Sequence, residues 1–332
     1  MRIIEGNDID SGLWSKLVKQ SSVATWFQSQ EAYAFFDSLS FLEAFAYAVE
    51  SDGVLKGVVV GYIQKDGGKL KQFLSRRAII LGGPLLADDI LNEELDVLLT
   101  ELKSKLRRKA IYIETRNFND YRCWIKCFED NGFIYEPHYD IVVDTSTIER
   151  VNENLGKSRK RDIRVSFRDG AVLVTRPTIE QVKEYYSILS NLYKNKVKTP
   201  LFPITFFEKF YFLPSAMFLL VEYEGHVIGG TVCVGLTGKA LYEMYACGKD
   251  GVHKSIFPSE LATYSGLQYA ANNGYPCFDM MGAGKPGDGG YGVRDFKLKF
   301  GGKLVEYGRY KTICKPLLYV IGTIGVKLLK SV

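Results

Sequence analysis

The sequence has few residues that could build a metal centre or a disulfide framework. It contains only three histidines in 332 residues, which argues against a metal cluster. Its six cysteines are scattered without paired spacing, which favours reduced thiols in a cytosolic protein over disulfides or a zinc site. The first residues carry charges where a signal peptide needs an apolar run, so no export is expected. We therefore expect a cytoplasmic protein without a bound metal.

Two common phosphate-binding motifs are also missing. The glycines match neither GxGxxG nor GxxxxGK(S/T), so we predict neither a Rossmann nor a Walker nucleotide loop. The sequence has instead a glycine-rich segment at residues 279–302, where a strand leads into a loop that can adopt positive φ and approach a ligand. After this loop, Arg294 and Lys297 provide cations beside Phe296. The combination favours a site for an anion or for acyl transfer, and a plain surface loop is the alternative.

Length and charge limit the number of domains and the kind of ligand to be expected. A chain of 332 residues exceeds one ordinary domain and fits two. The composition, 46% hydrophobic and 24% charged, is typical of a globular protein with an ample core. The net charge of +5 suits an anionic ligand but does not by itself predict nucleic-acid binding.

Hydrophobic periodicity predicts the order helix, hairpin, strand, helix, strand, helix, strand for the first half. Ser29 is placed to cap a helix, and the Ser-Asp-Gly sequence at residues 51–53 predicts the hairpin turn. The predicted helices span residues 11–20, 30–39, 90–106 and 121–131, and the predicted strands span 45–49, 54–63, 76–86, 110–114 and 133–143.

The second half repeats this order at a spacing of roughly 170 residues, which indicates a duplication and is too long for a solenoid repeat. Its predicted helices span residues 179–193, 205–212 and 258–273, and its predicted strands span 217–221, 227–234, 241–246, 277–281 and 303–310. We therefore expect an N-terminal domain at residues 1–145, a C-terminal domain at 146–312 and a tail at 313–332.

In each half, a two-stranded meander is followed by a third strand, a crossover helix and a fourth, parallel strand. This is the element order of the GNAT acyltransferase fold, so we predict an α/β (α+β) protein of two tandem GNAT-like domains. Each domain would contain a mixed, mainly antiparallel sheet flanked by helices. The ligand cleft is expected where adjacent strands part at their C-terminal ends.

Several segments form a series along nearly the whole chain. They are residues 26–29 (Trp-Phe-Gln-Ser), 77–84 (Arg-Ala-Ile-Ile-Leu-Gly-Gly-Pro), 158–164 (Ser-Arg-Lys-Arg-Asp-Ile-Arg), 169–172 (Asp-Gly-Ala-Val), 279–282 (Asp-Met-Met-Gly), 296–297 (Phe-Lys) and 300–302 (Phe-Gly-Gly). In this order they resemble the Fem family of tandem GNAT-like proteins. Members of that family transfer an amino acid from aminoacyl-tRNA to the peptide stem of a peptidoglycan precursor.

The resemblance implies an aminoacyltransferase (EC 2.3) of cytoplasmic peptidoglycan and cell-wall biosynthesis. Aminoacyl-tRNA would be the donor substrate, a UDP-linked or lipid-linked cell-wall precursor would be the acceptor, and no cofactor would be required. The chain lacks the long charged heptad insertion that forms a helical arm in some Fem proteins, so it resembles the armless form.

Two other functions stay open. One is an acyl-CoA-dependent N-acyltransferase in cell-surface polysaccharide synthesis, and the other is a non-catalytic tandem GNAT scaffold that binds an envelope glycan or peptide. Neither half has the Arg/Gln-x-x-Gly-x-Gly/Ala loop with which acetyl-CoA-dependent GNAT enzymes hold pyrophosphate, and this argues against acetyl-CoA.

The resemblance also implies roles for residues of the glycine-rich segment. Lys297 matches the family's lysine after phenylalanine, and its ammonium would stabilise the negative charge that develops during acyl transfer. Arg294, one helical turn earlier, would bind the acceptor. Asp279 would orient a group or accept a proton. The other predicted substrate-binding residues of the segment are Phe296, Gly282 and Gly284.

Three further groups of side chains are candidate contacts. Tyr242 and Tyr245 lie three apart on the predicted cleft strand, so they are expected to face opposite sides and at most one would line the site. Three lysines after the helix at 179–193 match a region where the family binds the precursor's pyrophosphate. Four cations at i, i+4, i+7 and i+11 share one helical face, which contacts tRNA phosphates or is simply solvated. The three lysines are Lys194, Lys196 and Lys198, and the four cations on one helical face are Lys157, Arg161, Arg164 and Arg168.

The tail after Cys314 is apolar apart from three lysines, and it is too short and too interrupted to predict a membrane span. We expect it to pack back on the first domain as a helix. Alternatively, it lies on the inner leaflet of the membrane near a lipid-linked substrate, which would make the protein peripheral.

Overall fold

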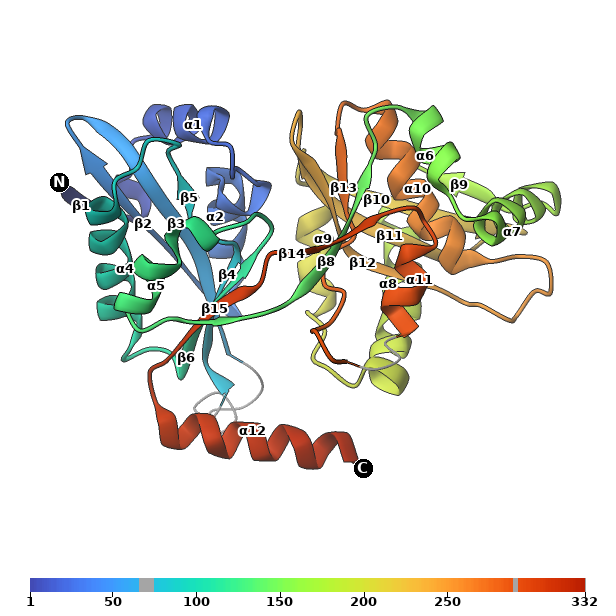
Figure 1. The fold of residues 1–332 in the computed structure, drawn as a ribbon. Coiled ribbons are helices and arrows are strands. Elements are labelled where there is room, and N and C mark those ends of the chain that lie inside the picture. The colour runs from blue at the N-terminus through green and yellow to red at the C-terminus, as the bar shows by residue number, and fades with distance from the viewer. Residues whose placement is uncertain (66–74, 289–291, 332) are drawn as a thin grey trace. The chain divides into compact units, whose positions relative to one another are not determined.

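The computed structural model describes residues 1–65, 75–288 and 292–331, with backbone only for residues 325–331. Contacts divide the chain into two compact units (Figure 1). Unit 1 comprises Met1–His138 and Glu306–Val332, and unit 2 comprises Tyr139–Val305. These limits differ from the domain boundaries expected at residues 145 and 312, because two strands pair in the sheet of the other half.

The sheet of unit 1 has the strand order β1-β2-β3-β4-β6-β15-β7, and β5 pairs with β3. β4 and β6 run parallel, as predicted for strands joined by a crossover helix. The strands are β1 (Arg2–Glu5), β2 (Leu42–Ser51), β3 (Val54–Gln64), β4 (Arg77–Gly82), β5 (Leu85–Leu86), β6 (Tyr112–Asn117), β7 (Ile134–Glu136) and β15 (Arg309–Ile313).

Helices cover both faces of this sheet (Figure 1). Leu98 and Phe128 pack with Val59 on one face, and Phe36 contacts Tyr62 on the other. The helices are α1 (Ser11–Gln20), α2 (Gln30–Asp37), α4 (Asn92–Leu106), α5 (Ile125–Asp130) and the C-terminal α12 (Pro316–Ser331), with short helical turns η1 (Gly6–Asp8), η2 (Trp26–Gln28) and η3 (Arg122–Trp124).

The sheet of unit 2 has the order β14-β8-β13-β12-β11-β10-β9. β12 and β13 run parallel, whereas β13 pairs antiparallel with β8 and the run from β9 to β12 is antiparallel. The strands are β8 (Tyr139–Asp144), β9 (Val172–Val174), β10 (Ala216–Tyr223), β11 (His226–Leu236), β12 (Ala240–Gly248), β13 (Cys277–Asp279) and β14 (Lys303–Glu306).

The core of unit 2 lies between this sheet and the apolar helix α10. Leu267 of α10 is fully buried with Cys233 and Phe278. On the opposite face, Phe207 contacts the ring of Tyr245 at 5.2 Å between centroids. The helices are α6 (Ile148–Asn154), α7 (Lys157–Arg168), α8 (Ile179–Leu192), α9 (Ile204–Tyr211), α10 (Pro258–Asn272) and α11 (Gly292–Leu298), with a π-helical turn η4 (Tyr193–Val197).

Two expected single strands are each divided between the units. The strand expected at 133–143 is interrupted at Pro137, so that β7 pairs in unit 1 and β8 pairs with β13 in unit 2. The strand expected at 303–310 turns at Gly308, which has a φ of +68°, and becomes β14 and β15. β15 lies between β6 and β7. Each sheet is therefore completed by a strand that the other half supplies.

Candidate active site at a strand fork

The parallel strands β12 and β13 form a fork in unit 2. They pair only from Ala240↔Cys277 to Tyr242↔Asp279, and β12 then continues to Gly248. The register of β11 against β12 shifts between Val232 and Cys233, which leaves Met244 as an extra, bulged residue. Because a bulge bends its strand, β12 diverges from β13 directly after the last pair. The fork lies where the sequence predicts the ligand cleft.

Two cations of α11 bind the backbone that leaves the fork. Lys297 Nζ donates to the carbonyl oxygens of residues 280, 281 and 282 at 2.5, 2.8 and 3.1 Å. Arg294 donates to the carbonyl oxygens of Ala283 and Lys285 at 2.7 and 3.0 Å. The two side chains therefore lie on one face of α11. Since an ammonium has three N–H donors, a substrate oxygen must replace one of these carbonyls to bind Lys297.

Three buried carboxylates lie close enough to this ammonium to act on it electrostatically. Asp279, Glu243 and Asp140 are only 2%, 6% and 4% exposed, and each raises the pKa of Lys297 electrostatically. Burial acts in the opposite direction and lowers the pKa of Lys297 overall. Burial also raises the pKa of Asp279 to about 7 and raises that of Glu243. The fork therefore holds a carboxyl group whose pKa burial raises toward neutrality, together with a cation, a combination that is common at functional sites.

Asp279 also shapes the backbone at the fork. Its carboxylate accepts a hydrogen bond from the backbone N–H of Met281 at 2.7 Å. Met281 has a φ of +52°, a conformation that residues other than glycine seldom adopt. Such strain is found mainly where surrounding contacts enforce it, often at functional sites. Here Asp279 and Lys297 together hold the strained turn.

Comparison with solved structures identifies the fold. A search with protein-family models found no match, and a search of curated proteins by sequence found none either. The crystal structure of FemX, however, matches with a TM-score of 0.74 and 15% identity over 97% of this chain and 99% of that chain. The chain has the tandem GNAT fold of FemX. The fold predicted from the sequence is thus confirmed.

Two further solved structures match nearly the whole chain. A tandem GNAT protein from the clavulanic acid biosynthesis pathway matches with a TM-score of 0.57 and 11% identity over 94% of this chain and 99% of that chain. L-PGS from Bacillus licheniformis matches with a TM-score of 0.56 and 14% identity over 98% of both chains. At these identities the likeness concerns the fold alone.

The prediction that Tyr242 and Tyr245 face opposite sides of the sheet is wrong. The bulge at Met244 shifts the alternation of side chains along β12 by one residue. Tyr242 and Tyr245 therefore pair with Val234 and Val232, which lie two residues apart on β11. Both tyrosines therefore face the side covered by α8 and α9. Tyr242 is also the direct neighbour of Asp279 on the parallel strand.

The glycine-rich segment is more closely packed than an open loop. The Gly282 carbonyl accepts from Lys297. Gly284 is buried with a φ of +85°, and its carbonyl accepts from the N–H of Tyr139 at 2.8 Å. Gly289 and Gly290 lie outside the described residues. In the described part, the backbone of this segment is held by α11 and β8.

Phe296 packs α11 against the core of unit 2. The guanidinium of Arg159 lies over its ring at 4.5 Å, and Phe300 lies beside it at 5.3 Å. Arg159 itself is buried and forms an ion pair with Glu260 at 2.7 Å. The ring of Phe296 thus packs against a buried ion pair, and its contact with substrate stays a prediction.

The two basic clusters lie on exposed surface. The predicted helix at the first cluster is α7, and its four predicted cations are exposed along one face. Arg161 forms an ion pair with Asp162 at 2.8 Å, and Arg168 with Asp169 at 2.7 Å. The second cluster follows Tyr193, whose ring contacts Tyr245 of the fork strand at 6.1 Å. Its exposed members are Lys194, Lys196 and Lys198.

Both crossover helices begin with acidic residues. The carboxylate of Asp250 accepts from the backbone N–H of Ser259 at 3.1 Å and from its hydroxyl at the start of α10. Pro258 occupies the first helical position and has no N–H to offer. In α4, Glu94 accepts from the N–H of Leu91 at 2.9 Å. Helix N-termini bind phosphates because their N–H groups are free, whereas these ends already face carboxylates.

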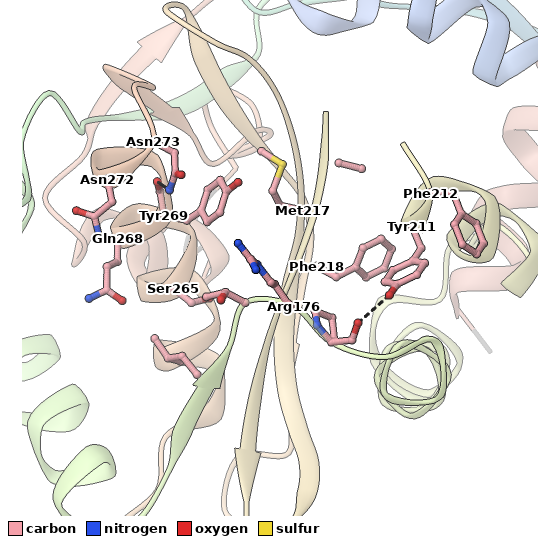
Figure 2. A pocket seen from close by; sticks show the side chains of 14 residues that line it. Arg176, Tyr211, Phe212, Met217, Phe218, Ser265, Gln268, Tyr269, Asn272 and Asn273 are labelled. Atoms are coloured by element: carbon pink, nitrogen blue, oxygen red, sulfur yellow. Dashed lines mark hydrogen bonds between the residues drawn. The ribbon is translucent and has the colours of Figure 1, made fainter. Parts of the chain in front are cut away.

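A separate cavity of about 810 Å³ lies in unit 2 and contains none of the predicted site residues. Its lining comes from the end of β9, the start of β10 and the last turns of α10 (Figure 2). The Arg176 side chain lies close enough to Tyr269 to act on it electrostatically. Tyr211 donates its hydroxyl to the carbonyl of Pro177 at 2.9 Å. No sequence pattern singled out these residues, because they converge from four separate segments.

All six cysteines are free thiols. Among the residues that the structure describes, no group of three His, Cys, Asp or Glu side chains is arranged to hold a metal ion.

Proposed function

We propose that this protein is an acyltransferase of the Fem type, which transfers an aminoacyl group from aminoacyl-tRNA to an amine of a peptidoglycan or other cell-envelope precursor. The observation that carries the proposal is the cluster of the half-buried Lys297 with the buried Asp279 and Glu243 at the strand fork. The FemX-like fold, which covers 97% of the chain, supports it.

In the proposed reaction, the acceptor amine attacks the ester carbonyl of aminoacyl-tRNA, so a C–N bond forms and the C–O bond to the ribose breaks. The amine must lose a proton, and Asp279 would accept it because its pKa lies at about 7. The proton then passes to the leaving ribose oxygen. Lys297 would stabilise the tetrahedral oxyanion after the substrate oxygen replaces one of its backbone partners.

The acidic helix ends favour aminoacyl-tRNA over acyl-CoA as the donor. A CoA pyrophosphate at the start of α10 would meet the Asp250 carboxylate and the acidic Glu260 of the first turn. The same position in α4 carries Glu93 and Glu94. Negative charges at a helix N-terminus repel a pyrophosphate. A reaction that depends on positioning an already activated ester therefore fits these helix ends better than one that uses acyl-CoA.

For the acceptor, the turn at η4 is the proposed pyrophosphate contact. Tyr193 packs against Tyr245 and so places the lysines that follow it near the fork strand. Exposed ammonium groups are suited to bind the pyrophosphate of a UDP-linked or lipid-linked precursor as point charges. The lysines concerned are Lys194, Lys196 and Lys198.

A thermal-shift screen of UDP-linked muropeptides against acyl-CoAs tests the substrate assignment. A ligand that binds only the folded protein raises its melting temperature. The proposal predicts stabilisation by muropeptides. Stabilisation by acetyl-CoA alone would instead favour an acyl-CoA-dependent N-acyltransferase, and binding of a glycan without any turnover would favour a non-catalytic scaffold.

Charge reversal on α7 tests the proposed tRNA contact. Arg164 is exposed and, within the described part of the chain, has no ion-pair partner, whereas Arg161 is paired with Asp162. We expect Arg164→Glu to weaken tRNA binding at low salt and to lower the slope of log Kd against log salt concentration by about 1. Lys183→Glu on the exposed surface of α8 is the matched control. If both variants bind tRNA like the wild type, this face of α7 is only solvated.

The pH dependence of turnover tests the proton acceptor. If Asp279 is the general base, turnover should rise with pH through a pKa of about 7, because only the deprotonated carboxylate can accept a proton. Asp279→Asn should remove this rise and slow the reaction about 10²-fold or more. A variant that keeps both the rate and the pH profile would show that Asp279 acts only on the turn at Met281.

The pH dependence of the stability of Asp279→Asn gives an independent check on the raised pKa of Asp279. Burial raises the pKa of Asp279, so the folded protein holds a proton that the unfolded chain, with an Asp pKa near 3.9, has already lost. The free energy of unfolding should therefore fall as pH rises from about 4 to about 7, and this part of the decrease should be absent in Asp279→Asn. Urea unfolding at several pH values measures it.

A further inference from the structure

The C-terminal helix α12 presents a stripe of exposed apolar side chains. Leu317, Val320, Ile321 and Ile324 are 82%, 54%, 54% and 53% exposed. Their spacing of i, i+3, i+4 and i+7 places them on one face of the helix. Side chains of this size are rarely left exposed together on a surface that has no partner.

The other side of α12 is attached to unit 1. The ring of Tyr319 contacts Tyr112 of β6 edge-on, at 5.6 Å between centroids. Lys315 donates to the carbonyl of Arg108 at 3.0 Å, and its backbone N–H donates to the carbonyl of Ile111, also at 3.0 Å. These contacts hold the first turns of the helix and direct the stripe away from the sheet.

Exposed cations lie close to the start of α12. Arg107 and Arg108 are exposed at the end of α4, and the hydrogen bond from Lys315 joins this corner to the start of α12. The sequence from residue 314 onward contains Lys315, Lys327 and Lys330 but no Asp or Glu. An apolar face bordered by positive charge matches the surface of a bilayer that contains anionic lipids.

The described part of α12 is shorter than the hydrocarbon core of a bilayer. Its 16 residues correspond to about 24 Å, which is shorter than the roughly 30 Å hydrocarbon core. Among the described residues, no helix is long and apolar enough to cross a membrane. The stripe is also small for a dimer contact, because four side chains offer on the order of 400 Å², about half of what a stable interface buries per partner.

We propose that α12 docks in the plane of a bilayer with anionic headgroups. The stripe of Leu317, Val320, Ile321 and Ile324 enters the acyl boundary, and Arg107, Arg108 and Lys315 contact the headgroups. This inference does not depend on the proposed transferase chemistry. If both hold, the helix keeps the protein beside a lipid-linked acceptor.

Vesicle sedimentation of the full-length protein tests the docking. Vesicles of phosphatidylcholine with about 30% phosphatidylglycerol are compared with pure phosphatidylcholine at low and high salt. We expect the wild type to sediment with the anionic vesicles at low salt and about tenfold less at high salt or with neutral vesicles, because the headgroup contacts are screened. The double variant Val320→Asp/Ile321→Asp should lose binding by at least tenfold, because two charges cannot enter the acyl boundary.

Leu91→Asp is the matched control. Leu91 is 59% exposed in the same unit, and it caps α4 at a position where Asp is favoured, so the variant should fold and bind vesicles like the wild type. Thermal unfolding verifies that both variants are folded. The proposal is overturned if the wild type does not bind anionic vesicles or if the double variant binds them equally well. It is also overturned if the stripe instead supports a concentration-dependent dimer, which light scattering detects.

Discussion

Replacing Lys297 by Met is expected to lower turnover by a factor on the order of 10² or more, by analogy with removal of one oxyanion donor. The methionine is similar in length but has no charge and no N–H donors. Three backbone carbonyls at residues 280–282 would lose their partner, and the carboxylates of Asp279 and Glu243 would lose the nearby cation. The variant should therefore also be less stable, by about 1–3 kcal/mol, the usual cost of leaving buried hydrogen-bonding groups unpaired.

Lys299→Met separates a loss of chemistry from a loss of folding. Lys299 lies two residues further on and is exposed, so its substitution should change neither turnover nor the melting temperature. Turnover of all three proteins is measured well below the melting temperature of the Lys297 variant, after muropeptide binding has been confirmed for each. Normal turnover in Lys297→Met would mean that the lysine is only a tether for the turn.

Replacing Tyr310 by Ala is expected to destabilise unit 1 by about 3–5 kcal/mol, the usual range for removal of a large buried aromatic side chain. Tyr310 lies in β15, is fully buried, and stacks on Phe128 at 3.9 Å between centroids. Its hydroxyl donates to the carbonyl of Tyr121 at 3.2 Å. This substitution therefore tests whether a strand from the end of the chain completes the first sheet.

Urea unfolding followed by tryptophan fluorescence measures this effect. All three tryptophans, Trp14, Trp26 and Trp124, belong to unit 1, so their emission reports on that unit. Ile313→Ala in the same strand is the control, because Ile313 is 41% exposed and should contribute far less. An equal loss in the free energy of unfolding for the two substitutions would contradict the placement of β15 in the first sheet.

The element order of both halves was predictable because it depends on local periodicity. The helices at residues 11–20 and 92–106 and the hairpin of β2 and β3 agree closely with the predicted ranges. The exchange of β8 and β15 between the sheets was not predicted, since pairing partners lie more than 100 residues away in sequence. Pro137 and Gly308 were nevertheless signals that the two long strands end there.

The candidate site was predictable only in part. Asp279 and Lys297 were identified through the resemblance of their motifs, whereas Glu243 and Asp140 were missed. Each of the missed residues is an acidic residue inside an apolar strand, a pattern that indicates a buried charge with a nearby partner. Their convergence on Lys297 depends on the fork and on the bulge at Met244, and neither can be inferred from alternation alone.

The most direct test of the proposed function is a transfer assay with two labelled donors. The protein is incubated with cell-envelope precursors that carry a free amine, together with either [14C]aminoacyl-tRNA or [14C]acetyl-CoA. We predict that the label moves from tRNA to the precursor amine with the wild type and about 10²-fold more slowly with Lys297→Met. Transfer from acetyl-CoA alone, or equal transfer from tRNA by both proteins, would contradict the account.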